Sequence, residues 1–202
     1  MHEILEVWTG RKGLTWIAVT AVIYVALLLP FNQVQWVVAG VPLRPAAALP
    51  VLFGILWGPA AAWGLCIGNV AGDFYGSWSP MSVFGALVNF LYPYLSYRLW
   101  HRWMKGREIR ADRLSLGGYL AVAFVTTFVC MAFLAACGTL FFSRPFESKF
   151  IGYFGNNIFW AMTVGTILFW LVTESAVRKG WVYGKEWTCA MARNARGKGA
   201  GG

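Results

Sequence analysis

The sequence predicts an all-α, polytopic membrane protein with six transmembrane helices and both termini in the cytoplasm. Three observations lead to this prediction. Of the 202 residues, 58% are hydrophobic and 12% are charged, whereas soluble domains carry about 25% charged residues. The charges are bunched, which leaves uncharged stretches of membrane-spanning length between them. The basic residues gather in particular connecting segments, and such gathering sets the orientation of membrane helices.

Four spans follow directly from the apolar stretches. A helix needs about 20 mostly apolar residues to cross the hydrocarbon core. Stretches that meet this requirement predict helices over 14–29, 81–99, 116–142 and 150–173. Each is bounded by charged or turn-forming residues, so the helices are expected to be separate.

The stretch 45–72 has no charge and contains Gly58-Pro59 near its middle. A proline inside a helix removes a hydrogen bond and breaks or kinks the helix. We therefore expect two short spans here, 46–57 and 60–75, joined by a tight turn.

Charge counting supports six spans over five. The segment 98–113 has six bases and two acids, and the segment after Glu174 has six bases and one acid. Cytoplasmic segments carry such an excess of Lys and Arg. Six spans place fourteen of the seventeen bases on one side, whereas five spans would leave Arg11 and Lys12 outside. The predicted organisation is a cytoplasmic N-terminus (1–13), a six-helix domain in the cell (inner) membrane (14–174) and a basic cytoplasmic tail (175–202).

The residue inventory predicts no enzyme activity, no cofactor and no metal. The two histidines, His2 and His101, lie in basic segments, so no span offers a haem ligand. The cysteines form no C-x-x-C pair, and Asp73 is the single acid in or beside the second to fifth spans. The net charge of +9 is attributed to topology and to contact with membrane lipid, not to nucleic acid.

Small residues recur at every fourth position along the third span. This spacing places them on one helix face, where they let another helix approach closely. Internal packing is the favoured interpretation, and an oligomer contact is the alternative. The predicted helix-packing residues are Ala60, Gly64, Gly68, Gly72 and Gly76.

Polar side chains inside the spans gather at one depth. Asn69 and Asp73 are four residues apart on one face of the third span, and Asn89 lies in the fourth. Asn156 and Asn157 lie in the sixth. The predicted topology places all five in the outer half of the membrane, where they are costly unless paired. The cluster favours an outward-opening pocket, with interhelical hydrogen bonding as the alternative.

Arg44 and Asp73 are the charges that flank the second and third spans on the outer side. They are placed to form an ion pair at the pocket mouth, and an interfacial anchor is the other role for Arg44. Nearby aromatic side chains suit a planar ligand. The candidate substrate-binding residues are Arg44, Asn69, Asp73, Asn89, Tyr92, Asn156, Asn157 and Trp160.

The run from Leu43 to Asp73 resembles the S components of energy-coupling factor (ECF) transporters. The matching pieces are Phe53-Gly54, Trp57-Gly58-Pro59, Gly68-Asn69 and Gly72-Asp73, within a match that covers residues 43–91. The resemblance implies a small membrane protein that captures a vitamin-like or metal micronutrient from outside. It also implies docking onto a transmembrane coupling subunit that is driven by two ATPases.

Family members that share a coupling subunit usually carry Ala-x-x-x-Ala in the first span. Here that span offers Ala18, Ala21 and Ala26, and Val22 interrupts the four-residue spacing. The resemblance implies that these alanines are the candidate partner-docking residues. The interrupted spacing leaves three alternatives to a shared coupling subunit, namely a dedicated partner, no partner, or recruitment to another membrane complex.

The predicted function is capture of a small, planar, largely uncharged micronutrient or precursor from the outer side, for ATP-driven uptake by partner subunits. The alternative is a structural or accessory subunit of a larger membrane complex, without transport activity. The interrupted motif of the first span and the twelve tryptophans motivate this alternative.

Overall fold

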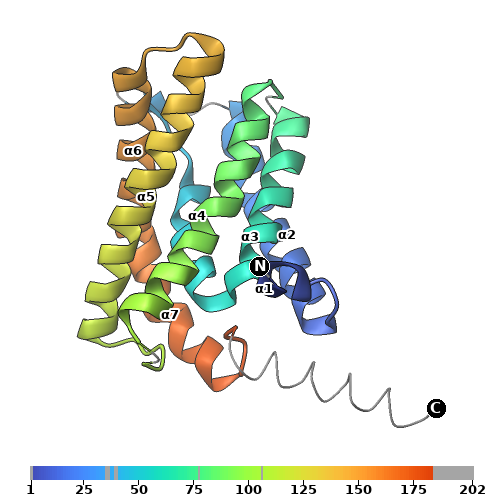
Figure 1. Cartoon of the computed structure of the whole chain (residues 1–202), viewed down its shortest axis with the longest axis vertical. Helices are drawn as coiled ribbons and strands as arrows, with labels where there is room; N and C mark the ends of the chain where they lie inside the picture. Colours follow the sequence, from blue (N-terminus) through green and yellow to red (C-terminus); the bar gives the residue numbers. More distant parts are fainter. Residues whose placement is uncertain (1, 35–36, 39–40, 77, 106, 184–202) are drawn as a thin grey trace, which may run out of the picture.

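The computed structural model describes residues 2–34, 37–38, 41–76, 78–105 and 107–183. Figure 1 shows a bundle of helices, which confirms the predicted all-α class. A two-residue antiparallel pair, β1 (Val37–Val38) with β2 (Val41–Pro42), lies in the connection after α2. The helices are α1 (His2–Glu6), α2 (Arg11–Val34), η1 (Pro45–Ala48), α3 (Leu49–Gly76), α4 (Met81–Trp103), α5 (Arg113–Phe142), α6 (Phe146–Met162) and α7 (Val164–Arg178).

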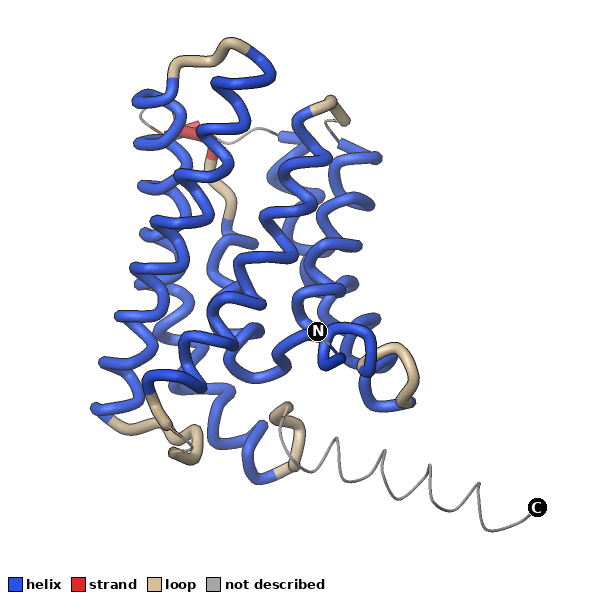
Figure 2. Tube along the Cα trace, viewed as in Figure 1, coloured by secondary structure: helices blue, strands red, loops and turns tan. Residues whose placement is uncertain are grey.

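Helix α3 consists of two legs joined at Gly58. Gly58 has φ 50° and ψ −128°, a backbone conformation that glycine adopts without a steric penalty. Pro59 then begins the second leg, where its fixed φ suits a first helical position. Figure 2 shows the chain reaching this turn and running back along the bundle. The tight turn expected at Gly58-Pro59 is therefore present.

The second leg of α3 packs closely against α2. A β-carbon at Gly64 would lie 1.8 Å from Thr20 Oγ1, and one at Gly72 would lie 2.5 Å from Leu28 Cδ2. Gly68 faces Ala21 and Tyr24 in the same way. Ala60 is fully buried, whereas Gly76 is exposed at the helix end. Along this contact the residue numbers of α2 and of the second leg increase in the same direction, so the two helices run parallel.

The helix expected over 150–173 is broken into α6 and α7 at Thr163, which has φ −95° and ψ −81°. Beside the break, the Tyr119 hydroxyl of α5 donates to the Ala161 carbonyl over 2.8 Å. A β-carbon at Gly165 would lie 2.2 Å from that hydroxyl. No proline marks this position in the sequence, so the break was not predicted.

Four helical stretches are long and apolar enough to cross a membrane within the described ranges: Arg11–Phe31, Pro45–Gly76, Arg113–Phe142 and Phe146–Arg178. Helix α4, predicted as a span over 81–99, forms over 23 residues. It is not among the four, and its tyrosines, serines and Asn89 make it less apolar.

The first and last described residues lie at the same end of the bundle. The connection between α4 and α5 lies at that end too (Figure 1). Trp63 Nε1 donates to the Ile4 carbonyl over 2.9 Å, which fixes α1. The Tyr183 backbone N–H donates to the Leu56 carbonyl over 2.7 Å, beside the turn of α3. The predicted tail 175–202 is described as far as Tyr183, and its remainder lies outside the described residues.

Candidate functional site

A chain of hydrogen-bonded polar side chains links α2, α3 and α4. The Tyr24 hydroxyl donates to Asn89 Oδ1 over 2.7 Å. Asn89 Nδ2 donates to Asn69 Oδ1 over 3.0 Å, and Asn69 Nδ2 donates to Asp73 Oδ2 over 3.2 Å. Asn69, Asp73 and Tyr24 are buried, with 2%, 6% and 5% of their surface exposed. This polar chain therefore lies inside an apolar bundle.

The direction of the polar chain is set by one backbone contact. Asn89 Nδ2 also donates to the Gly85 carbonyl over 2.9 Å. A carbonyl oxygen accepts only, so the amide nitrogen of Asn89 must face it. The Oδ1 atom of Asn89 is then left for the Tyr24 hydroxyl, and each later donor points toward Asp73. The chain thus ends on a carboxylate that accepts.

The carboxylate of Asp73 keeps one unused acceptor. Its Oδ1 atom is buried and has no hydrogen-bond partner among the described residues. Gly85 of α4 lies opposite, where a β-carbon would stand 3.4 Å from Asn69 Nδ2 and 4.0 Å from Asp73 Oδ2. Because a buried polar atom without a partner is costly, this oxygen is suited to a donor from a bound molecule.

The ion pair expected between Arg44 and Asp73 is not formed. Asp73 receives its hydrogen bond from Asn69, one helical turn away. The side chain of Arg44 is exposed, and its backbone N–H donates to Asn156 Oδ1 over 3.3 Å. The ion pairs of the described ranges join Glu3 to Arg98, Arg107 to Asp112 and Glu108 to Arg110. The Arg44 backbone is instead hydrogen-bonded to Asn156 of α6, so the predicted Arg44–Asp73 ion pair is wrong.

The polar residues of α6 form a second group. Asn156 holds the Arg44 backbone, whereas Asn157 Nδ2 donates to the Tyr153 carbonyl of its own helix over 2.9 Å. Trp160 Nε1 is buried and lacks a partner within the part of the chain described. Direct hydrogen bonds therefore join Asn69, Asp73 and Asn89 of the predicted set, and Asn156 is joined to Arg44.

Tyr92 is 1% exposed, and its hydroxyl forms a hydrogen bond with the Thr127 hydroxyl of α5. The next turn of α4 repeats this contact, since Ser96 Oγ donates to Thr126 Oγ1 over 3.2 Å. These bonds fasten α4 to α5. They place the Tyr92 ring between the two helices.

Sequence reasoning missed Tyr24. It lies four residues after Thr20 and four before Leu28, and these three residues face Gly64, Gly68 and Gly72 in turn. The sequence feature that could have identified it is a tyrosine hydroxyl on the helix face that packs against the glycine stripe of the third span. Residues on this face of α2 are brought against the second leg of α3, where Asn69 also lies.

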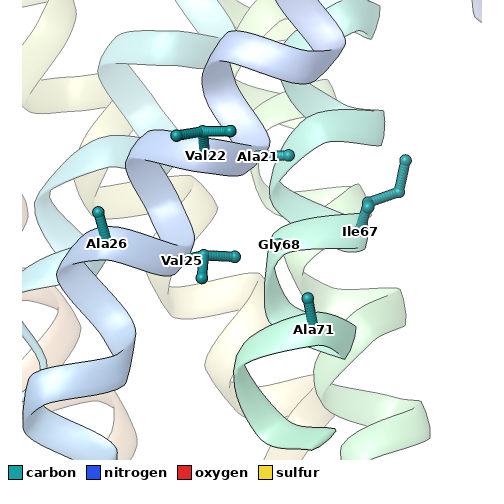
Figure 3. Close-up of a pocket in the computed structure, with 7 residues that line it drawn as sticks. All are labelled: Ala21, Val22, Val25, Ala26, Ile67, Gly68 and Ala71. Carbon is teal, nitrogen blue, oxygen red and sulfur yellow. The ribbon is translucent and has the colours of Figure 1, made fainter. Parts of the chain in front are cut away.

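Of the three predicted docking alanines, Ala21 and Ala26 line an apolar groove between α2 and α3, and Ala18 does not. Figure 3 shows its lining, and the groove has a volume of about 310 Å³. Ala18 and Ala26 are exposed and Ala21 is half-buried, while Val22, between them, is 67% exposed. The lining residues are Ala21, Val22, Val25 and Ala26 from α2, and Ile67, Gly68 and Ala71 from α3.

Comparison with known proteins gives one family. The family model described as "QueT transporter" matches residues 14–174 of this chain. That range coincides with the predicted six-helix domain, 14–174. No curated protein and no solved structure matches the chain significantly.

Proposed function

Because the chain belongs to the QueT transporter family of ECF S components, we propose that it captures a queuosine precursor from the outer side of the membrane. In this proposal, partner subunits that hydrolyse ATP then drive the uptake. A queuosine precursor is a planar 7-deazaguanine base, with hydrogen-bond donors and acceptors along its edges. The planar shape of such a base agrees with the planar ligand that the sequence predicts.

The proposed topology has six crossings and both ends in the cytoplasm. The crossing segments are α2, the two legs of α3, α4, α5 and the pair α6–α7. The end of the bundle with α1, Tyr183 and the α4–α5 connection also carries most described bases, Arg98 and Arg107 among them. Positively charged connections stay on the cytoplasmic side. The opposite end, with Arg44 and Lys149, then faces outward.

One observation supports the location of the site above all others. The polar chain from Tyr24 to Asp73 is buried, and it ends on an oxygen without a partner in the described structure. Polar groups within membrane spans are costly and are therefore typical of functional sites. We assign Asn69, Asp73 and Asn89 as the first contacts of the ligand. The further contacts proposed are Arg44, Tyr92, Asn156, Asn157 and Trp160.

A binding titration on the purified protein tests this proposal. Quenching of tryptophan fluorescence by 7-aminomethyl-7-deazaguanine should saturate with the wild type. Asn69→Leu keeps the side-chain size but breaks two hydrogen bonds of the polar chain, so affinity should fall at least about tenfold. Thr166→Val is the control, because the Thr166 hydroxyl of α7 donates to the Met162 carbonyl at the end of α6 and takes no part in the polar chain. Saturable binding by Asn69→Leu with unchanged affinity would contradict the assignment.

The partner surface proposed is the apolar groove between α2 and α3. Small residues let a helix of a coupling subunit approach closely, as packing in membranes requires. Ala26→Trp fills this groove and should abolish co-purification with the coupling subunit while ligand binding persists. Ala121→Trp, on an exposed position of α5, should leave the complex intact. A complex that survives Ala26→Trp would place the docking surface elsewhere.

A further inference from the structure

We propose that one end of the bundle binds an anionic phospholipid, on a surface formed by the start of α2 and the residues that follow α7. This Lys–Trp surface consists of Lys12, Trp16, Lys179 and Trp181. It lies at the end of the bundle that holds α1 and the α4–α5 connection (Figure 1), which the proposed topology places at the cytoplasmic leaflet. The surface takes no part in the polar chain that starts at Tyr24, so the lipid is a partner additional to the captured ligand.

The tryptophans of this surface are held by ring contacts between elements far apart in the sequence. The Trp16 ring lies 4.4 Å from the ring of the buried Trp57, with an angle of 19° between their planes. The Trp181 ring lies 5.5 Å from the Trp16 ring, and Lys179 Nζ lies 4.5 Å from the centre of the Trp181 ring. Trp181 is 41% exposed, and Lys179 is exposed as well. An indole and an ammonium group are therefore held together at the edge of the bundle.

Gly180 brings Lys179 and Trp181 together. Its φ is 63°, in the left-handed region that glycine adopts without a steric penalty. The Trp181 backbone N–H then donates to the Ala176 carbonyl of α7 over 2.9 Å, so the chain turns back beside the end of the helix. A β-carbon at Gly180 would meet nothing within 4 Å. Open space for a lipid headgroup therefore lies next to this pair.

The start of α2 adds positive charge. Its first turn contains Arg11 and Lys12 and no acid, although a helix N-terminus is itself partially positive and favours acids. Lys12 lies one turn before Trp16, on the same face of α2. The ion pairs of the described residues include none of Arg11, Lys12 and Lys179. An anion bound here therefore supplies a counter-charge that these ion pairs do not.

The residue types favour a lipid over a free phosphate ion. Tryptophans gather at the level of the lipid headgroups, and bases beside the cytoplasmic leaflet attract anionic lipids. A free phosphate ion would bind the ammonium groups but would make no use of the rings. Among the other bases at this end, Arg107 and Arg110 are already paired with Asp112 and Glu108. The Lys–Trp surface thus combines unpaired charge with the rings that a headgroup contacts.

Mass spectrometry of the intact protein in mild detergent tests this proposal by counting bound lipids. With equal amounts of phosphatidylglycerol and phosphatidylcholine, the wild type should bind the anionic lipid first, with a preference of at least about tenfold. Lys12→Gln combined with Lys179→Gln should remove most of this preference. The matched control is Lys105→Gln combined with Arg113→Gln, because it removes two exposed bases from the ends of the α4–α5 connection. This control should keep the preference.

Each other result would overturn the proposal. Equal binding of the two lipids by the wild type would show that the surface does not select an anionic lipid. An equal loss in the two double variants would show that the charge of the whole end matters and not this surface. Displacement of the lipid by equimolar inorganic phosphate would identify a free-ion site. If the first double variant kept the lipid preference but lost co-purifying subunits, the surface would be a contact for an acidic protein. The lipid competition on the wild type is decisive even if a variant fails to fold.

Discussion

At the scale of single residues, Asn89 is the centre of the polar chain. Its amide accepts from Tyr24 and donates to Asn69 and to the Gly85 carbonyl. The side chain therefore joins α2, α3 and α4 at one point. A buried amide with all of these partners stabilises a bundle, and one that loses them is costly.

Asn89→Leu should lower the thermal unfolding midpoint of the purified protein. The substitution removes the hydrogen bonds that Asn89 makes to the Tyr24 hydroxyl and to Asn69 Oδ1. Each buried polar group left unpaired lowers the free energy of unfolding by about 1–3 kcal/mol. The unfolding midpoint followed by tryptophan fluorescence measures the effect. Thr139→Val is the matched control, because Thr139 is exposed and bonds within its own helix. Equal midpoints for the two variants would show that Asn89 is not a structural centre.

We expect the stability of the protein to depend on pH through Asp112, which lies in the connection between α4 and α5. It caps α5 by accepting from the Ser115 backbone N–H over 2.7 Å. That bond, together with Arg107, lowers the pKa of the Asp112 carboxyl from 3.8 to about 2. A lowered pKa stabilises the folded protein above the unfolded pKa, and the stabilisation is lost as pH falls from near 4 through about 2.

Asp112→Ala should therefore be less stable than the wild type near neutral pH, and the difference should shrink toward pH 2. Denaturant unfolding of both proteins across this pH range measures it. A difference that stays constant from pH 7 to pH 2 would mean that the carboxylate charge is not the stabilising feature.

At the scale of elements, the contact between α2 and α3 depends on the absence of side chains at the glycine stripe. A β-carbon at Gly64 would lie 1.8 Å from Thr20 Oγ1 and 2.7 Å from the Ile17 carbonyl oxygen. Backbone atoms cannot move aside as a flexible side chain can. The two helices would have to separate, and Tyr24, the first residue of the polar chain, packs against Gly68 in the same contact.

Gly64→Ala should destabilise the protein by about 1–3 kcal/mol, the usual cost of overpacking. Gly117→Ala is the control, because nothing lies within 4 Å of a β-carbon there, and alanine favours a helix over glycine by about 0.5–1 kcal/mol. Unfolding in denaturant distinguishes them. A destabilised control, or an unaffected Gly64→Ala, would argue against close packing at this stripe.

Most elements could be predicted from apolar length and from Gly58-Pro59, because hydrocarbon thickness and proline chemistry act locally. The break at Thr163 could not be predicted, because it lies beside a contact with Tyr119, a residue that is distant in the sequence. The same reason explains the site. Asn69 and Asp73 share one helix and were paired correctly, whereas the partners of Arg44 and Asn156 depend on how α6 meets the segment before η1.

At the scale of the whole molecule, the proposed capture from outside requires a defined orientation. In a cysteine-free background, Glu108→Cys should be protected from a membrane-impermeant thiol reagent in intact cells. Ser148→Cys, at the opposite end of the bundle, should be labelled. Glu108 lies in the basic connection after α4, and Ser148 lies in the first turn of α6. The reverse labelling pattern would invert the orientation.

The structure of the purified protein with 7-aminomethyl-7-deazaguanine bound would test the central claim most directly. We expect the base to contact Asn69, Asp73 and Asn89. A base bound elsewhere in the bundle, with the hydrogen bonds from Tyr24 to Asp73 unchanged, would show that this polar chain serves packing and not capture.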